Sequence, residues 1–388
     1  MSGLRILADE NIPGLAHFFE PLGSVRTLPG RAIRAPDLQD VDVLLVRSVT
    51  RVDEQLLGDT PVRFVGTATI GTDHLDTGYL DRAGIQWSAA PGCNAKAVAD
   101  YVLSCLALAT RDRDQSFQGL SVGIVGCGNV GGGLRQRLCD LGLTVLANDP
   151  PREAAGEGGF SSLDAVLACD AVCLHAPLVR DGPWPTHHLL DARRIEALTP
   201  DQILISAGRG AVVDNRALLD RLGGHGEGPW TALDVWENEP AIEAALAERV
   251  SIATPHIAGY SLEGKLRGTA MIHDALCRHL GVQSGRSMAM LLPPDESLIL
   301  DGAENTPPFA VLSQALLAAY NPARDSGALK AAQNGDPSER RSAFDRLRRD
   351  YPVRREFGHQ VPQGVADPAA LRLLSAAGFP GVTGRSGS

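Results

Sequence analysis

Residues 121–135 read SVGIVGCGNVGGGLR, and this stretch decides the fold of the chain. It opens with an apolar run that predicts a buried strand and continues into an amphipathic segment that predicts a helix. Between the two, glycines stand at positions 126, 128 and 131, in the spacing G-x-G-x-x-G. The first permits a tight turn, the second lets a ligand approach the backbone, and the third lets the helix pack close to the strand.

This strand, turn and helix together predict a dinucleotide-binding turn made of Gly126, Gly128, Asn129, Val130 and Gly131. Free N–H groups and the positive end of the helix dipole would face the pyrophosphate. The next apolar strand, TVLAND, ends in Asp149, 23 residues after the first glycine. A carboxylate at that place would accept hydrogen bonds from an adenosine ribose. The alternative is a glycine-rich turn in another kind of α/β protein.

Length and composition narrow the class of protein. The chain has 388 residues, enough for two or three domains, and 44% of them are hydrophobic. A net charge of −10 argues against a nucleic-acid surface. The seven cysteines are scattered without metal-ligand spacing, so we expect no metal site and a reducing cytoplasm. We find no secretory signal and no apolar stretch long enough to span a bilayer, so we expect no membrane association.

Short apolar runs alternate with helical patterns on both sides of the glycine turn. Before the turn, strands are predicted at RILAD (5–9), VDVLLVRS (41–48), VRFVGTAT (62–69) and IQWSAAP (85–91). This alternation predicts two doubly wound parallel-sheet domains, one flavodoxin-like, the other a Rossmann domain. We expect the first domain to comprise residues 1–94 and 261–288, the Rossmann domain residues 95–260, and a small α+β domain residues 289–388. Helices are expected over 95–111 and 261–280, the second returning to the first sheet.

The C-terminal region has an apolar helical segment, 309–320, and an arginine-rich one, 338–349. The apolar segment needs a partner surface, so we predict a homodimer held through the C-terminal domain. The arginines alternate with acidic residues, which favours a solvated or inter-subunit salt-bridge face. Phosphate binding by these arginines is the alternative.

Polar side chains follow three of the later strands. QILISAGRG ends in Arg209, TALDVWENEP carries Glu239, and VSIATPHIAGY carries His256. Ligands bind at the carboxyl ends of strands in open parallel sheets, so we expect the three to lie near the cofactor. Histidine can take a hydroxyl proton near neutral pH, a carboxylate can fix its ring, and arginine can hold a carboxylate with two parallel bonds. Each residue alone could be structural, but together they indicate alcohol oxidation.

The motifs GNVG, GRGAVVD, LDVWENEP and TPHIAG resemble those of the D-2-hydroxyacid dehydrogenases. The resemblance implies an NAD-dependent enzyme with Arg209 as the ligand of the substrate carboxylate and His256 as the proton acceptor. It also implies that the first domain, residues 1–94 and 261–288, is the substrate-binding domain. It assigns Glu239 rather than Glu237 as the partner of the histidine, because the family's glutamate directly precedes the proline.

The resemblance also implies further contacts. Substrate contacts would fall on Ser48, Thr69 and Tyr260, and cofactor contacts on Asp149, Ala207, Gly208, Asp234 and Gly259. The substrate would be a small phosphorylated 2-hydroxy acid. Arg47 ends the strand VDVLLV, so we expect it to meet the phosphate together with Ser48. The alternatives are a structural salt bridge for Arg47 and phosphate binding by arginines of the C-terminal region, including those of a second subunit.

Two other functions stay open. One is another dehydrogenase of the same family, of the phosphoglycerate type, against which the arginine-rich C-terminal segment argues. The other is an NAD-sensing interaction protein built on the same fold, against which the combination of Arg209, Glu239 and His256 argues.

Overall fold

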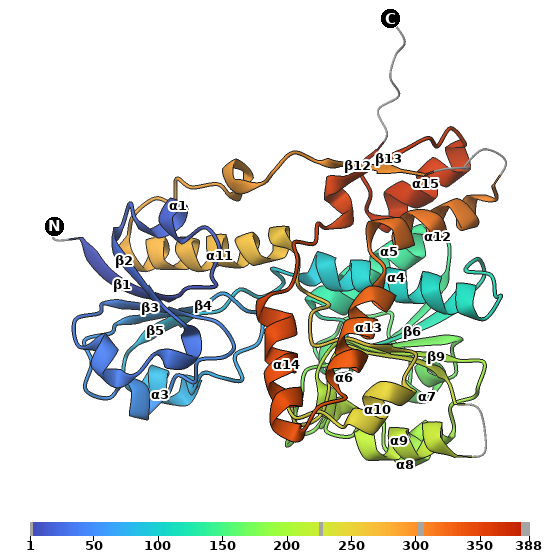
Figure 1. Ribbon diagram of the computed structural model, residues 1–388, viewed down its shortest axis with the longest axis horizontal. Coiled ribbons are helices and arrows are strands. Elements are labelled where there is room, and N and C mark those ends of the chain that lie inside the picture. Colours follow the sequence, from blue (N-terminus) through green and yellow to red (C-terminus); the bar gives the residue numbers. More distant parts are fainter. Residues whose placement is uncertain (1–2, 225–227, 301–305, 382–388) are drawn as a thin grey trace, which may run out of the picture. The chain divides into compact units, whose positions relative to one another are not determined.

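The computed structural model describes residues 3–224, 228–300 and 306–381 (Figure 1). These described residues fall into two compact units, one within residues 1–94 and 261–293 and the other within residues 95–260 and 294–388. Both units are α/β, as the sequence predicts. Among the described residues, no helix combines the length and the apolar character needed to cross a membrane.

The first unit is built on a parallel sheet with the strand order β2-β1-β3-β4-β5, the flavodoxin-like order predicted for it. Its strands are β1 (Leu4–Asp9), β2 (Gly23–Leu28), β3 (Val43–Val46), β4 (Phe64–Thr67) and β5 (Gln86–Ser88). Its helices are α1 (Leu15–Phe19), α2 (Glu54–Leu57), α3 (Thr77–Arg82) and α11 (Leu262–Leu280), with short 3-10 turns at Gly30–Ala32, Ala35–Leu38 and Met288–Leu291.

Strand β2 is missing from the strands that the sequence predicts. It lies at the edge of the sheet, and Ser24, Arg26 and Thr27 are exposed. An edge strand with polar outward residues has no continuous apolar run, so the pattern that reveals a buried strand is absent. The returning helix α11, in contrast, is found as predicted, and its Ile272 and Leu276 are buried in the core of this unit.

The second unit is built on a parallel sheet with the order β11-β10-β9-β8-β6-β7. Its strands are β6 (Ser121–Val125), β7 (Thr144–Asn148), β8 (Ala171–Leu174), β9 (Ile203–Ser206), β10 (Trp230–Leu233) and β11 (Ile252–Ala253). After β7 the chain crosses β6 to reach β8. The carboxyl ends of β6 and β8 therefore flank the point where the winding reverses, which is where doubly wound sheets bind ligands.

Helices cover both faces of this sheet. They are α4 (Ala95–Asp112), α5 (Asn129–Asp140), α6 (Pro150–Ala154), α7 (Leu163–Leu167), α8 (Ala192–Glu196), α9 (Asn215–Gly223) and α10 (Ala244–Arg249), with a 3-10 turn at Gly210–Val212. Helix α4 was predicted over 95–111. It is buried from Ala97 to Thr110, which explains its almost wholly apolar sequence.

The C-terminal region adds α12 (Pro308–Ala319), α13 (Pro322–Ala332), α14 (Pro337–Arg349) and α15 (Pro368–Ala377). Its strands β12 (Glu296–Ile299) and β13 (Gln360–Gln363) form a parallel pair, and a 3-10 turn spans Phe357–His359. The two helices predicted here, 309–320 and 338–349, match α12 and α14 within one residue.

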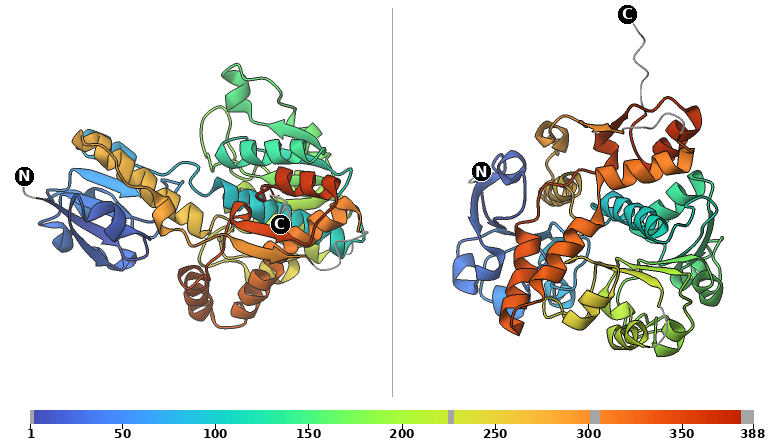
Figure 2. Two further views of the ribbon diagram at one scale, coloured as in Figure 1. Left: turned by 90° about the horizontal axis from the view of Figure 1, so that it is seen from above. Right: turned by 45° about the vertical axis from the view of Figure 1, so that its right-hand side comes forward.

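This region shares its apolar core with the nucleotide-binding sheet. Helices α12 and α15 pack against α4 and α5, and Figures 1 and 2 both show this arrangement. Leu316 and Phe357 are buried in one cluster with Leu106 of α4. Phe344 of α14 is buried in a second cluster with Leu218 and Trp236. The C-terminal helices are therefore held firmly on the unit that carries the glycine turn.

Candidate active site

The glycine turn follows β6, and each glycine has a physical reason to be there. Gly126 has φ +86°, and a Cβ on it would lie 2.6 Å from the backbone nitrogen of Ala176. A Cβ on Gly131 would lie 2.0 Å from the carbonyl oxygen of Gly126. Gly128 caps α5, and no described atom lies within 4 Å of a Cβ placed there. The turn thus leaves room for a phosphate at Gly128 and none for side chains at Gly126 and Gly131, which fits a dinucleotide.

Asp149 follows β7 and lies against this turn. Its Oδ2 accepts a hydrogen bond of 2.7 Å from the N–H of Cys127, and its Oδ1 caps α6 through the N–H of Arg152. The guanidinium group of Arg152 donates to the carbonyl of Cys127 and pairs with Glu157. A carboxylate and a cation therefore lie side by side where the adenosine ribose is expected.

Ala207, Gly208 and Arg209 follow β9. A Cβ on Gly208 would come within 2.9 Å of the carbonyl oxygen of Ala176, so this segment packs tightly on the chain after β8. Arg209 is half-buried, and its Nη1 donates to the carbonyl of Gly208 at 2.9 Å. This bond holds the arginine at the same sheet edge as the glycine turn.

Asp234 follows β10 and fixes the loop that carries His256. Its Oδ1 accepts from the hydroxyl of Thr254 at 2.7 Å and from the N–H of Ile257 at 2.8 Å, and its Oδ2 accepts from the N–H of Ala258 at 2.9 Å. Burial raises the pKa of Asp234, and these hydrogen bonds act against that rise. The cofactor contact predicted for Asp234 stays a prediction.

His256 has a left-handed backbone with φ +57°, which is uncommon outside glycine. Its N–H donates to the carbonyl of Asp234 at 2.8 Å, so the surrounding bonds hold this conformation. Residues kept in such conformations cluster at functional sites. The direction of the imidazole is thus set by the loop rather than left to solvent.

The ring of His256 is held by Glu239. Its Nδ1 lies 2.7 Å from Oε2 of the glutamate, whose Oε1 accepts from the N–H of Trp236 at 2.9 Å. Burial alone would raise the pKa of Glu239, but the charge and hydrogen bond of His256, the Trp236 N–H and the charge of Arg348 lower it on balance. With Nδ1–H donated to the carboxylate, Nε2 carries the lone pair and can accept a proton.

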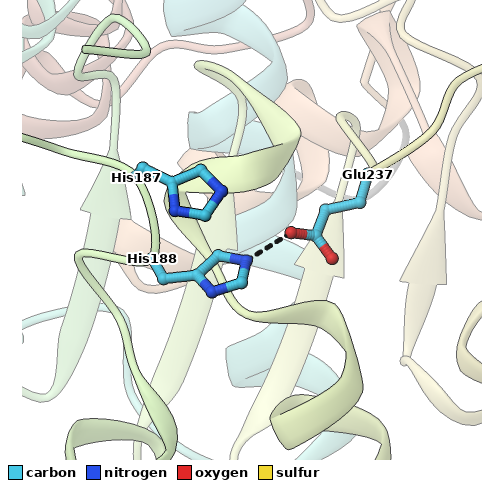
Figure 3. Close-up of side chains that lie close together, drawn as sticks. All are labelled: His187, His188 and Glu237. Carbon is cyan, nitrogen blue, oxygen red and sulfur yellow. Dashed lines mark hydrogen bonds and ion pairs between the residues drawn. The ribbon is translucent and has the colours of Figure 1, made fainter. Parts of the chain in front are cut away.

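Glu237, the other candidate carboxylate, serves a different histidine. Its side chain pairs with Nε2 of His188, as Figure 3 shows. Nδ1 of His188 lies 3.6 Å from Oδ2 of Asp214. The rings of His187 and His188 are stacked, with their centroids 4.1 Å apart. The geometry therefore places Glu239, and not Glu237, beside His256.

His187, His188 and Glu237 bring three possible ligand atoms within 4.8 Å of one another. A cation there would have to displace the ion pairs of His188 with Glu237 and Asp214. No sequence spacing indicates this cluster, because Glu237 lies 49 residues after His188 along the chain.

In the first unit, the predicted substrate contacts also lie at carboxyl strand ends. Arg47 and Ser48 directly follow β3, and Thr69 comes two residues after β4. The hydroxyl of Thr69 lies 2.8 Å from that of Thr67 and donates to the carbonyl of Gly71 at 3.0 Å. Tyr260 ends the first stretch of the second unit, next to Gly259, and its ring lies 5.9 Å from that of Tyr351.

Sequence reasoning missed several residues around these strand ends. Thr254 links Asp234 to the hydroxyl of Tyr101, 2.9 Å away. His175 follows β8, and burial lowers its pKa to about 4. Both of its ring nitrogens are enclosed without a hydrogen-bond partner in the described part of the chain. A histidine in the sequence LHAP gives no sign of this environment, because the enclosure is tertiary.

Comparisons with known proteins agree with this geometry. Residues 106–258 match the family model "D-isomer specific 2-hydroxyacid dehydrogenase, NAD binding domain", and residues 291–378 match a domain of unknown function, DUF3410. The erythronate-4-phosphate dehydrogenase of Stutzerimonas stutzeri is 48% identical, over 97% of this chain and 99% of that protein. The Pseudomonas aeruginosa enzyme of the same name is 52% identical, over 93% and 96%.

Solved structures show the same fold. The TT0316 protein of Thermus thermophilus has a TM-score of 0.61 at 26% identity, covering 73% of this chain and 99% of that one. The NAD-bound 3-phosphoglycerate dehydrogenase of Entamoeba histolytica has a TM-score of 0.62 at 18% identity, covering 72% and 96%. From the extent and identity of the matches to its curated relatives, this chain belongs to the erythronate-4-phosphate dehydrogenase family, within the D-isomer specific 2-hydroxyacid dehydrogenases.

Proposed function

We propose that this protein oxidises the 2-hydroxyl of 4-phospho-D-erythronate to (R)-3-hydroxy-2-oxo-4-phosphooxybutanoate, a step of pyridoxine biosynthesis. The observation that carries the proposal is the hydrogen bond between His256 and Glu239, found in a chain that matches erythronate-4-phosphate dehydrogenases over nearly its full length. The residues of the glycine turn would hold NAD, which would supply the acceptor for the hydride that leaves C2 of the substrate.

His256 takes the hydroxyl proton on Nε2 as the alcohol becomes a ketone. Glu239 fixes the tautomer by accepting the Nδ1 proton at 2.7 Å, and its negative charge stabilises the imidazolium that forms. Arg209 binds the substrate carboxylate with a bidentate fork, which places C2 and its hydroxyl near His256. Its positive charge also stabilises the partial negative charge on the C2 oxygen as the ketone forms.

The remaining contacts follow from the strand ends. In the second unit, Asp149, Ala207, Gly208, Asp234 and Gly259 would contact NAD, along with Gly126 to Gly131 of the turn, and Tyr260 would contact the substrate. In the first unit, Ser48 and Thr69 would contact the substrate, and Arg47 its phosphate. Their support is that each lies at or beyond the carboxyl end of a parallel strand, or in the loop after β11.

The protein would work as a homodimer joined through residues 289–388. The apolar segment 309–320, for which a partner surface was expected, packs on α4 and α15 of the same chain. The support for a dimer is instead that Ile299 and Val353 of this region are 72% and 76% exposed and would offer apolar surface to a second subunit. Light scattering of the full chain tests this, and a monomer at micromolar concentration would contradict it. The cytoplasm is the expected compartment, because all seven cysteines are free thiols.

The activity is tested with the purified chain, NAD and 4-phospho-D-erythronate, with 3-phosphoglycerate as the comparison substrate. We expect NADH and a 2-oxo acid from the first compound at a much higher kcat/KM than from the second. The reverse preference would assign the chain a different substrate within the same reaction class.

A further inference from the structure

Arg348 lies in the last turn of α14, in the C-terminal region that matches a domain of unknown function. Its guanidinium carbon is 5.9 Å from the centroid of the Tyr260 ring and 6.0 Å from that of Phe344. Phe344 is fully buried with Trp236, the residue whose N–H holds Glu239. Helix α14 therefore delivers this arginine to the catalytic loops of its own chain.

The environment of Arg348 is unusual for a cation. The side chain is half-buried, and its Nε is enclosed without a hydrogen-bond partner among the described residues. No carboxylate in the described part of the chain lies within ion-pair distance of it, whereas the next residue, Arg349, pairs with Asp350 at 2.8 Å. A guanidinium group withdrawn from water is costly unless an anion meets it.

Arg348 interacts electrostatically with two residues of the candidate site, Tyr260 and Glu239. Its charge is among those that lower the pKa of Glu239, and the charge of Glu239 is among those that favour the charged arginine. A cation that lies close enough to act on Glu239, and that has no ion-pair partner of its own, is placed for an anion that arrives beside His256.

We propose that Arg348, in addition to the Arg47 proposed above, binds the phosphate group of the substrate, so that the C-terminal region of the same chain completes the substrate site. This inference rests on the proposed function, because the substrate must carry a phosphate. The substrate has two anionic ends, and Arg209 is already suited to the carboxylate. A guanidinium fork matches two phosphate oxygens, and the ring of Tyr260 beneath it restrains its plane by a cation–π contact.

A second arginine of the same region, Arg354, anchors the segment that follows α14. Arg354 is buried, donates to the carbonyls of Ala258 and Ala97, and lies 4.4 Å over the ring of Tyr320. Its bond to Ala258 ties the segment after α14 to the loop that carries His256. Arg354 is thus a structural arginine of this segment, unlike Arg348, whose enclosed Nε has no hydrogen-bond partner within the described ranges of the chain.

The test compares Arg348→Ala and Arg348→Lys with wild type. We expect kcat/KM for 4-phospho-D-erythronate to fall about 10- to 100-fold in Arg348→Ala, mostly through KM, as for the loss of hydrogen bonds to a charged group. The inhibition constant of D-erythronate, used as a competing ligand without phosphate, should not change. Arg348→Lys should recover only part of the affinity, because a point charge cannot reproduce the fork.

Arg346→Ala is the matched control, since this arginine lies two residues earlier on the same helix and is exposed. It should leave both constants unchanged. Equal weakening of both ligands by Arg348→Ala would overturn the phosphate assignment, as would wild-type kinetics. Arg348→Lys retains the bulk and charge of the side chain, so it decides the matter if the alanine variant does not fold. Wild-type enzyme that fails to oxidise 4-phospho-D-erythronate would refute the proposed function instead.

Discussion

Replacing Glu239 by glutamine should abolish most turnover, because the site needs two acceptors from this side chain. Oε2 accepts from Nδ1 of His256 and Oε1 accepts from the N–H of Trp236, at 2.7 and 2.9 Å. A glutamine has one acceptor oxygen and one NH2 group. The backbone N–H of Trp236 can only donate, so it pairs with the amide oxygen of the glutamine. The NH2 group then faces Nδ1 and forces the ring proton onto Nε2, the atom that must accept the substrate proton.

The expected loss follows from this change of tautomer. Removing a general base costs about 10²- to 10⁴-fold in rate, and a ring locked in the wrong tautomer is a lost base. That range corresponds to about 2.7–5.5 kcal/mol of transition-state stabilisation. NAD affinity should stay near the wild-type value, because neither hydrogen bond of Glu239 involves the glycine turn.

The assay is steady-state NADH formation from 4-phospho-D-erythronate, with NAD affinity measured separately by titration. Glu237→Gln is the matched control: it makes the same chemical change two residues away, where the carboxylate pairs with His188. The control should keep most of its kcat. If Glu239→Gln keeps a wild-type kcat, or if the control loses as much, the assignment of the His256 partner fails.

Three further results are expected. Gly131→Ala should lower both the free energy of unfolding and NAD affinity, because its Cβ would lie 2.0 Å from a backbone oxygen. Gly128→Ala has open space around its Cβ and should weaken NAD binding alone, so equal melting temperatures for the two variants would contradict this reasoning. Asp149→Ser should reduce the preference for NAD over NADP, since it removes a carboxylate that repels a 2′-phosphate and leaves the neighbouring Arg152; an unchanged ratio of kcat/KM values would place the ribose elsewhere. The pKa of Glu239 is lowered in the folded state, so the ionised carboxylate stabilises the fold above the ordinary pKa of 4.5, and this stabilisation is lost as pH falls through the folded pKa. The free energies of unfolding in urea of wild type and Glu239→Gln should therefore differ near neutral pH and converge in acid, and a difference that does not change with pH would refute the linkage.

Local patterns predicted much of the fold. The apolar run before Gly126 and the amphipathic segment after it specify β6 and α5, because burial and turn geometry there depend on neighbours in sequence. The strand ends placed Arg209 and His256 at one sheet edge for the same reason. Strand β2 escaped prediction because an edge strand keeps its polar residues in water.

What the sequence could not supply were contacts set by tertiary packing. The arginine-rich segment was predicted as a helix, but its pattern cannot distinguish Arg348 from the exposed Arg346. That distinction comes from Phe344, which anchors α14 in the core next to Trp236. In the same way, the pairing of His188 with Glu237 depends on two loops that meet only in the folded sheet.

The most direct test of the account is a single-turnover experiment with the purified enzyme in excess over 4-phospho-D-erythronate and with NAD saturating. It measures the oxidation step whether or not NADH leaves readily. The account predicts one NADH and one 2-oxo acid per substrate molecule in the wild type, and almost no NADH on the same timescale in His256→Ala with its NAD binding intact. Equal rapid formation of NADH by the His256→Ala variant would contradict the central claim that His256, held by Glu239, accepts the proton of the 2-hydroxyl.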